Sequence, residues 1–185
     1  MKYLARAILR LGGWRIEGAK PDLEKYVLVA APHTSNWDFL WMICMAQALE
    51  IPVSWLGKDA LFHPLIGWFF QLLGGIPVDR SAPSDLVSRL ASRFASSSDL
   101  VLLVPVEGTR GHGLHWKSGF YHIARAAQVP VVLGFLDYVK RTGGFGPMLV
   151  PTGEVASDMD VPRGFYAGIA GKFPALASPV RLKGE

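Results

Sequence analysis

Residues 26–38 read Tyr-Val-Leu-Val-Ala-Ala-Pro-His-Thr-Ser-Asn-Trp-Asp, an apolar run followed by a polar turn. The run from Tyr26 to Ala31 is too apolar to have a wet face, so it predicts a strand that is buried on both sides. One of residues 34–36 can cap a helix that begins near Trp37. This stretch therefore predicts a strand, a turn and a helix in direct succession.

The rest of the chain repeats this alternation. Short apolar runs with β-branched residues, expected as strands, are residues 26–31, 53–56, 100–106, 129–136 and 148–150. Helix-like stretches lie between them at residues 37–49, 61–73, 84–95 and 117–127. Because strands and helices alternate, we expect a single layered α/β domain over residues 1–185, with a largely parallel or mixed sheet flanked by helices.

His33 lies where the first predicted strand ends, and Asp38 follows five residues later. Open α/β sheets place their ligands at the carboxyl ends of strands. The carboxylate of Asp38 can accept a hydrogen bond from one imidazole nitrogen and leave the other as a base. No Gly-x-Ser-x-Gly motif occurs, so the base would activate a hydroxyl of a substrate. The alternative is an ordinary turn histidine and an ordinary aspartate at a helix start.

A second polar group follows another predicted strand, in residues 104–110, Val-Pro-Val-Glu-Gly-Thr-Arg. A carboxylate, a glycine that admits close backbone approach, a hydroxyl and a guanidinium together suit an anionic, oxygen-rich ligand. Lys117 opens the next predicted helix, and Arg80 follows a short predicted strand at residues 76–78. Arg80, Arg110 and Lys117 can converge on a phosphate, or each can be a solvated surface charge. The candidate substrate-binding residues in this segment are Glu107, Gly108, Thr109 and Arg110.

Taken together, these segments resemble the glycerolipid acyltransferase superfamily. Residues 33–38 are similar to its His-x4-Asp block, and residues 104–110 resemble its Phe-Pro-Glu-Gly-Thr-Arg block with the proline one place early. Residues 75–80 resemble the block that ends in arginine, and residues 129–132 resemble the apolar block that contains proline. The resemblance spans roughly residues 26–136, and the first and third blocks form its specific part.

The resemblance implies a glycerol-3-phosphate acyltransferase-like fold and acyl transfer to a hydroxyl of a lysophospholipid-like acceptor. The donor would be acyl-CoA or acyl carrier protein, with no other cofactor. His33, oriented by Asp38, would be the general base for direct attack on the thioester. Residues 107–110 would hold the acceptor or its phosphate, with Arg80 and Lys117 assisting. Plausible walls of an acyl-chain groove are Phe62, Trp68, Phe69 and Phe70.

Two other classes of function remain open. A thioester or ester hydrolase would use the same histidine and aspartate to activate water, and a non-catalytic lipid-binding module would keep only the fold. The set of basic residues suited to an acceptor phosphate favours transfer over hydrolysis. The intact His33, Asp38 and Glu107 argue against a binding module.

Metal and nucleic-acid sites are not indicated. His112, His115 and His122 lie near one another in the sequence, but no carboxylate or cysteine completes a ligand set there. The six tryptophans are scattered and no basic run interleaves with them, so no stacking surface for nucleic acid is expected. Cys44 is the single cysteine, which excludes an internal disulfide and indicates a buried thiol in a reducing compartment.

Several features point to a membrane surface. Half of the residues are hydrophobic, 18% are charged, and the net charge is +4. Residues 1–11 read as a short basic amphipathic helix rather than a signal peptide, because Lys2, Arg6 and Arg10 interrupt any continuous apolar run. The alternative is a first helix that packs on the core. Residues 1–24 would form this helix and its lead-in, and residues 26–136 the motif-bearing core.

Residues 60–78 carry no charged side chain and are long enough to invite a transmembrane assignment. Prolines and glycines divide this segment, so we expect an apolar helix at residues 61–73, a Gly-Gly turn and a short strand at residues 76–78. The whole pattern predicts a peripheral protein on the cytoplasmic side of the cell membrane. It would dock on anionic lipid through residues 1–11 and 61–73.

Overall fold

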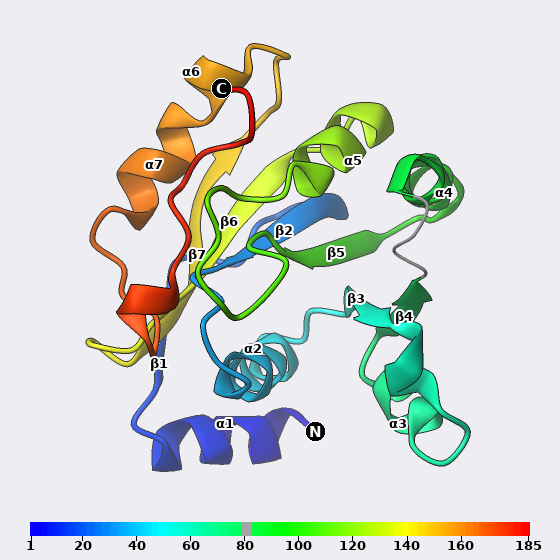
Figure 1. Cartoon of the computed structure of the whole chain (residues 1–185). Helices are drawn as coiled ribbons and strands as arrows, with labels where there is room; N and C mark the ends of the chain where they lie inside the picture. Colours follow the sequence, from blue (N-terminus) through cyan, green and yellow to red (C-terminus); the bar gives the residue numbers. More distant parts are fainter. Residues whose placement is uncertain (79–82) are drawn as a thin grey trace.

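A seven-stranded sheet organises residues 1–78 and 83–185, the part of the chain that the computed structural model describes (Figure 1). Its strands are β1 (Arg15–Glu17), β2 (Lys25–Ala31), β3 (Val53–Lys58), β4 (Gly75–Val78), β5 (Leu100–Pro105), β6 (Val131–Asp137) and β7 (Thr142–Leu149). Their order across the sheet is β1-β7-β6-β2-β5-β3-β4. Neighbouring strands run parallel except β6 and β7. This arrangement confirms the predicted α/β fold with a largely parallel sheet.

Helices cover both faces of the sheet. They are α1 (Lys2–Leu11), α2 (Trp37–Ala48), α3 (Gly67–Leu72), α4 (Pro83–Ser96), α5 (Gly119–Ala127), α6 (Val155–Asp158) and α7 (Asp160–Tyr166), with 3-10 turns η1 (Asp59–Phe62) and η2 (Pro174–Leu176). Helices α4 and α5 pack on one face through side chains such as Phe94 and Phe120. Helix α2 packs on the opposite face, and α1 packs on α2, where Cys44 is buried (Figure 1).

The centre of the sheet positions the two polar loops. Strand β2 lies between β5 and β6, and its Ala30 pairs with Pro105 of β5. Because β2 and β5 are parallel neighbours, the loops that follow them leave the same edge of the sheet side by side. The residues after β2 include His33, and the residues after β5 include Glu107. The topology therefore brings together two segments that are far apart in the sequence.

The predicted helix at residues 61–73 is wrong in its extent. The chain forms η1, then a turn, and only then the short helix α3. Pro64 and Gly67 explain the break. Proline restricts the residue before it, and a Cβ atom on Gly67 would lie 2.6 Å from the carbonyl oxygen of Phe62. Such a close approach is possible only for glycine.

The last sheet strands also differ from the prediction. Strand β7 begins at Thr142 rather than at residue 148, and β1 has no counterpart among the predicted strands. Within β7, Gly144 has a φ of +152°. A Cβ atom added to Gly144 would lie only 1.9 Å from the carbonyl oxygen of Glu17. Glycine is thus required where β1 pairs closely with β7. Across the described residues, no helix is long and apolar enough to cross a membrane.

Candidate active site

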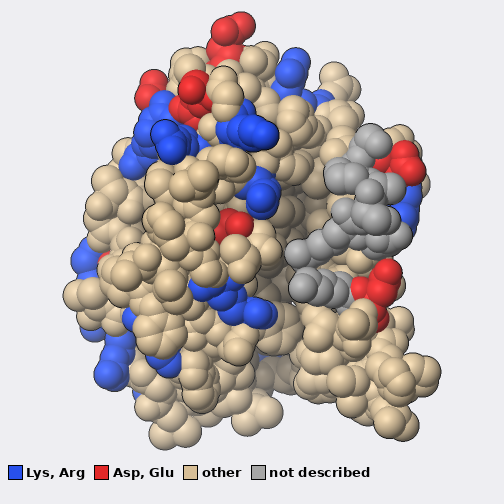
Figure 2. Space-filling model, in the orientation of Figure 1, with Lys and Arg blue, Asp and Glu red and all other residues tan. Residues whose placement is uncertain are grey.

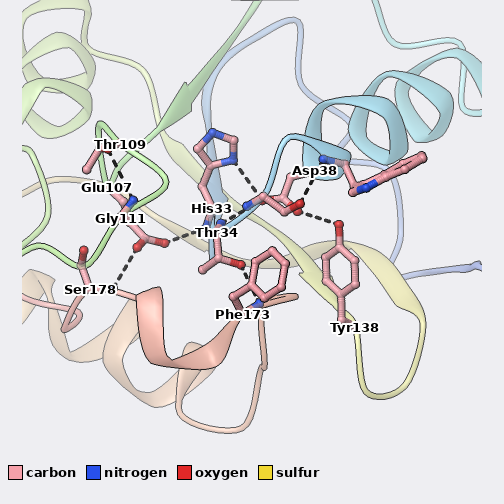
Figure 3. A network of polar contacts seen from close by, with 11 residues as sticks. His33, Thr34, Asp38, Glu107, Thr109, Gly111, Tyr138, Phe173 and Ser178 are labelled. Atoms are coloured by element: carbon pink, nitrogen blue, oxygen red, sulfur yellow. Dashed lines mark hydrogen bonds and ion pairs between the residues drawn. The ribbon is translucent and has the colours of Figure 1, made fainter.

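His33, in the loop between β2 and α2, meets Asp38 in the first turn of α2 (Figure 3). Nδ1 of His33 lies 3.2 Å from Oδ2 of Asp38. The same oxygen accepts the backbone N–H groups of Thr34 and Ser35, each at 2.9 Å. The other oxygen, Oδ1, accepts a hydrogen bond from the hydroxyl of Tyr138 at 2.6 Å. The carboxylate is thus saturated with donors and holds the imidazole by one nitrogen.

Asp38 is only 4% exposed, yet its environment favours the ionised form. Burial raises the pKa of Asp38, but the hydrogen bonds from His33, Tyr138 and Ser35 outweigh burial and leave this pKa below its ordinary value. An ionised Asp38 favours the proton staying on Nδ1, where the N–H faces Oδ2, and so fixes the tautomer in which Nε2 is free. In that tautomer, Nε2 can take a proton from a hydroxyl group.

Glu107 connects three segments of the chain. Its side chain is 2% exposed; Oε1 accepts the backbone N–H of His33 at 2.6 Å and Oε2 accepts that of Ser178 at 2.8 Å (Figure 3). These contacts join the β2–α2 loop, the loop after β5 and the segment near the C-terminus. Both oxygens of Glu107 contact backbone groups, and its predicted role in holding an acceptor stays a prediction.

The loop after Glu107 supplies exposed polar groups. Gly108, Thr109 and Arg110 line the same cavity as His33. Gly108 has a φ of +71°, and a Cβ atom there would lie 2.9 Å from Cγ of Lys117. The side chain of Lys117 therefore packs closely against this loop, and its predicted role in holding a phosphate stays a prediction. Arg80, the other predicted cation, lies outside the described residues.

A cavity of about 350 Å³ extends from His33 between α2 and the sheet. Its polar end is formed by His33, Asp38, Thr109 and Arg110. The remainder is apolar, with walls from α2 and from β2, β3 and β5. The principal apolar lining residues are Phe39, Met42, Met45, Ala46, Leu49, Leu28, Ala30, Val53, Trp55 and Leu103. The cavity thus joins a base and a cation to a deep apolar space.

The predicted groove residues lie elsewhere. Phe62, Trp68, Phe69 and Phe70 are not among the residues that line this cavity. The rings of Phe62 and Phe70 pack on Trp55, with centroids 6.1 and 6.0 Å away, whereas Trp68 is 64% and Phe69 46% exposed. Sequence reasoning predicted α2 as a helix but missed its role as a wall of the cavity. The helix is apolar on nearly every face, so its pattern does not show which side lines a cavity.

Three contacts near the site had no signal in the sequence. Tyr138 lies 100 residues after Asp38. The backbone N–H of Phe173 donates to Oγ1 of Thr34 at 3.2 Å, and Ser178 contacts Glu107. These residues carry no motif, and only the folded chain brings them to the site. His112 and His115 instead have their Nδ1 atoms beside backbone carbonyl oxygens, at 3.1 and 3.0 Å.

Comparisons with known proteins show what the chain is similar to. The family model for Acyltransferase matches residues 15–132. A 1-acyl-sn-glycerol-3-phosphate acyltransferase from Salmonella typhimurium is 32% identical over 132 residues, which cover 66% of this chain and 52% of that protein. The 1-acyl-sn-glycerol-3-phosphate acyltransferase alpha of Homo sapiens is 32% identical over 144 residues, covering 71% and 50%. The chain spans about half the length of these curated relatives.

A solved structure shares the fold. The crystal structure of the 1-acyl-sn-glycerophosphate (LPA) acyltransferase, PlsC, from Thermotoga maritima aligns with a TM-score of 0.61 and 19% sequence identity. The alignment covers 90% of this chain and 78% of that one. At 19% identity, this similarity supports a shared fold and nothing more specific. The matched family segment, residues 15–132, contains His33, Asp38 and Glu107 and ends before Tyr138.

Proposed function

The chain belongs to the glycerolipid acyltransferase superfamily, and on this basis we propose that it moves a fatty acyl group from a thioester to a hydroxyl of a lysophospholipid-like acceptor. The donor is acyl-CoA or acyl carrier protein, with no other cofactor. One observation carries the proposal: His33, held by Asp38 at 3.2 Å, stands where an apolar cavity meets the exposed loop of Arg110. In this proposal, His33 acts as the base between a space suited to an acyl chain and a cation suited to a phosphate.

The reaction follows from these positions. Nε2 of His33 takes the proton of the acceptor hydroxyl as its oxygen attacks the thioester carbonyl carbon. The new C–O bond forms, the C–S bond breaks, and the departing sulfur takes the proton from His33, which gives an ester and a free thiol. Asp38 stabilises the charged imidazole during the transfer. No acyl-enzyme is formed, so no nucleophilic side chain is required.

Substrate placement follows the polarity of the cavity. The apolar space between α2 and the sheet takes the acyl chain. The whole cavity, polar end included, has a volume of about 350 Å³, within the range of small-ligand pockets. Arg110 and Lys117 hold the acceptor phosphate at the open end, because a guanidinium can form two hydrogen bonds to one phosphate. Glu107 acts by holding the His33 loop in place.

Labelled acyl-CoA, and separately labelled acyl carrier protein, test the assignment when each is incubated with the protein with and without a lysophospholipid extract. Labelled phospholipid that appears only with the extract supports transfer. Labelled free acid formed regardless of the extract would replace the proposal with a hydrolase. If neither product forms while labelled donor is retained by the protein, the chain is a binding module instead.

The proposed place of action is the cytoplasmic side of the cell membrane, where the protein docks on anionic lipid as a peripheral protein. Support comes from apolar side chains left exposed on two elements, Tyr3 and Leu4 of α1 and Leu65 and Trp68 around α3. In Figure 2, the lobe at lower right, where Figure 1 draws α3, shows no lysine or arginine over its lower part. Arg6 and Arg10 of α1 add positive charge that attracts anionic headgroups.

A further inference from the structure

The carboxylate of Asp38 has two partners on opposite oxygens. Oδ2 faces Nδ1 of His33 at 3.2 Å, and Oδ1 accepts the hydroxyl of Tyr138 at 2.6 Å (Figure 3). A hydrogen bond from a hydroxyl to a carboxylate at this length belongs to the strong, charge-assisted class. His33, Asp38 and Tyr138 therefore form one continuous chain of polar contacts.

Tyr138 is itself held from several sides. It opens the turn between β6 and β7, where buried Asp137 accepts the backbone N–H groups of Val139 and Lys140 at 3.0 and 3.2 Å. The backbone N–H of Tyr138 donates to the carbonyl of Ala170 at 2.9 Å. Its ring meets Trp14 edge to face, with centroids 5.0 Å apart. These contacts thus fix the position from which the Tyr138 hydroxyl reaches Asp38.

The hydroxyl of Tyr138 also remains a donor at all working pH values. Burial and the hydrogen bond to Asp38 raise the pKa of Tyr138 well above its ordinary value. Without this hydroxyl, Oδ1 would be a buried acceptor with no partner, since the two backbone donors and the imidazole all contact Oδ2. A carboxylate with one unpaired buried oxygen is stabilised if it rotates or if water enters beside it. Either change alters its contact with the imidazole.

We propose that Tyr138 is a positioning residue for acyl transfer: its hydroxyl fixes the rotation of the Asp38 carboxylate so that Oδ2 stays directed at Nδ1 of His33. This inference rests on the proposed function for its catalytic consequence. Tyr138 lies beyond residues 15–132, the segment that the family model matches. The residue therefore extends the His33–Asp38 pair with a contribution from the part of the chain outside that segment.

The chain offers a matched control for this hydrogen bond. Tyr121 donates its hydroxyl to Oδ2 of Asp158, also at 2.6 Å, on the other side of the sheet. Tyr138→Phe and Tyr121→Phe therefore remove the same type of bond, one at the His33–Asp38 pair and one away from it. A loss caused only by weakened folding would affect both variants, whereas a loss of positioning would affect Tyr138→Phe alone.

The first measurement is steady-state acyl transfer by the wild type and both variants, alongside their thermal unfolding. We expect Tyr138→Phe to lower kcat by about tenfold or more, the scale of one lost hydrogen bond to a charged group. The KM values for donor and acceptor should stay within about twofold of wild type, as expected when only transition-state stabilisation is lost. In an Asp38→Asn background, Tyr138→Phe should cost far less. Equal losses in both tyrosine variants, or additive losses in the double variant, would overturn the inference.

The second measurement does not depend on activity and separates this inference from the proposed function. NMR follows protonation of the Asp38 carboxyl. The hydrogen bond from Tyr138 favours the ionised carboxylate, so its removal raises the pKa of Asp38. The Asp38 carboxyl in Tyr138→Phe should therefore hold its proton to higher pH than in wild type or Tyr121→Phe. An unchanged titration would overturn the inference, whereas wild type that transfers no acyl group would overturn the proposed function alone.

Discussion

Oε1 of Glu107 accepts the backbone N–H of His33 at 2.6 Å, so the two polar loops are joined directly at the proposed base. The other oxygen of Glu107 holds the backbone of Ser178. The position of the imidazole thus depends on three segments that are distant in the sequence. In the proposed mechanism, Glu107 holds the loop of the base, whereas the exposed Thr109 and Arg110 can contact a substrate.

Glu107→Gln tests the holding role. The amide can accept one of the two backbone N–H groups, but its NH2 then faces the other, which leaves buried donors opposed. We expect the free energy of unfolding to fall by about 1–3 kcal/mol and kcat to fall with it. The acceptor KM should change little. A large rise in the acceptor KM with unchanged stability would show that Glu107 binds substrate instead.

Arg110→Ala tests the acceptor site. Loss of a hydrogen bond between a guanidinium and a phosphate at an exposed position should raise the acceptor KM by about tenfold, with the donor KM unchanged. Arg93→Ala on α4 serves as the control, because Arg93 is an exposed arginine that does not line the cavity. A rise in the donor KM alone would assign Arg110 to the nucleotide of acyl-CoA. No change in either would make it a solvated surface charge.

Ala46→Leu tests the acyl-chain cavity. The added methyl groups occupy space between α2 and the sheet, so the preferred donor should become shorter, with about fourfold loss for each methylene that no longer fits. Ala95→Leu, at an exposed position of α4, is the matched control. The measurement is kcat/KM across donors of increasing chain length. A chain-length change in Phe69→Ala but not in Ala46→Leu would return the groove to the residues first predicted from the sequence.

Vesicle flotation tests docking. With anionic vesicles at low salt the protein should float, and high salt should release it only in part, because apolar burial resists salt while basic residues do not. Trp68→Ser should weaken flotation, and Val150→Ser, at an exposed residue after β7, should not. Protein that never floats would contradict docking. Protein that resists carbonate extraction would be integral and would contradict the peripheral assignment.

Local patterns predicted the centre of the fold well. The apolar run, turn and helix start at residues 26–38 became β2, the His33 loop and α2 with small boundary shifts. Parallel pairing of β2 and β5 then brings His33 to Glu107 without further information. These features depend on residues close in the chain and on the shared direction of strands, which a sequence expresses directly.

Other features depend on packing and left no pattern. The predicted strand begins only at residue 148, because Gly143, Gly144 and Gly146 interrupt any strand pattern before it, although β1 pairs with Gly143 and Gly144. The aromatic run at residues 68–70 looked like a groove wall, but the cavity formed along α2 instead. Tyr138 reaches Asp38 only after β6 and β7 form their turn. Contacts of this kind are set by tertiary structure.

The most direct test of the account is the rate of acyl transfer in His33→Ala, measured with labelled acyl-CoA and a lysophospholipid acceptor. Thermal unfolding and acyl-CoA binding of the variant serve as controls for fold and site. The account predicts that both controls stay at wild-type values while transfer falls by about 10²–10⁴-fold, the usual contribution of a general base. Transfer within about threefold of wild type in a folded variant would contradict the assignment of His33 as the base, because a general base contributes far more than that.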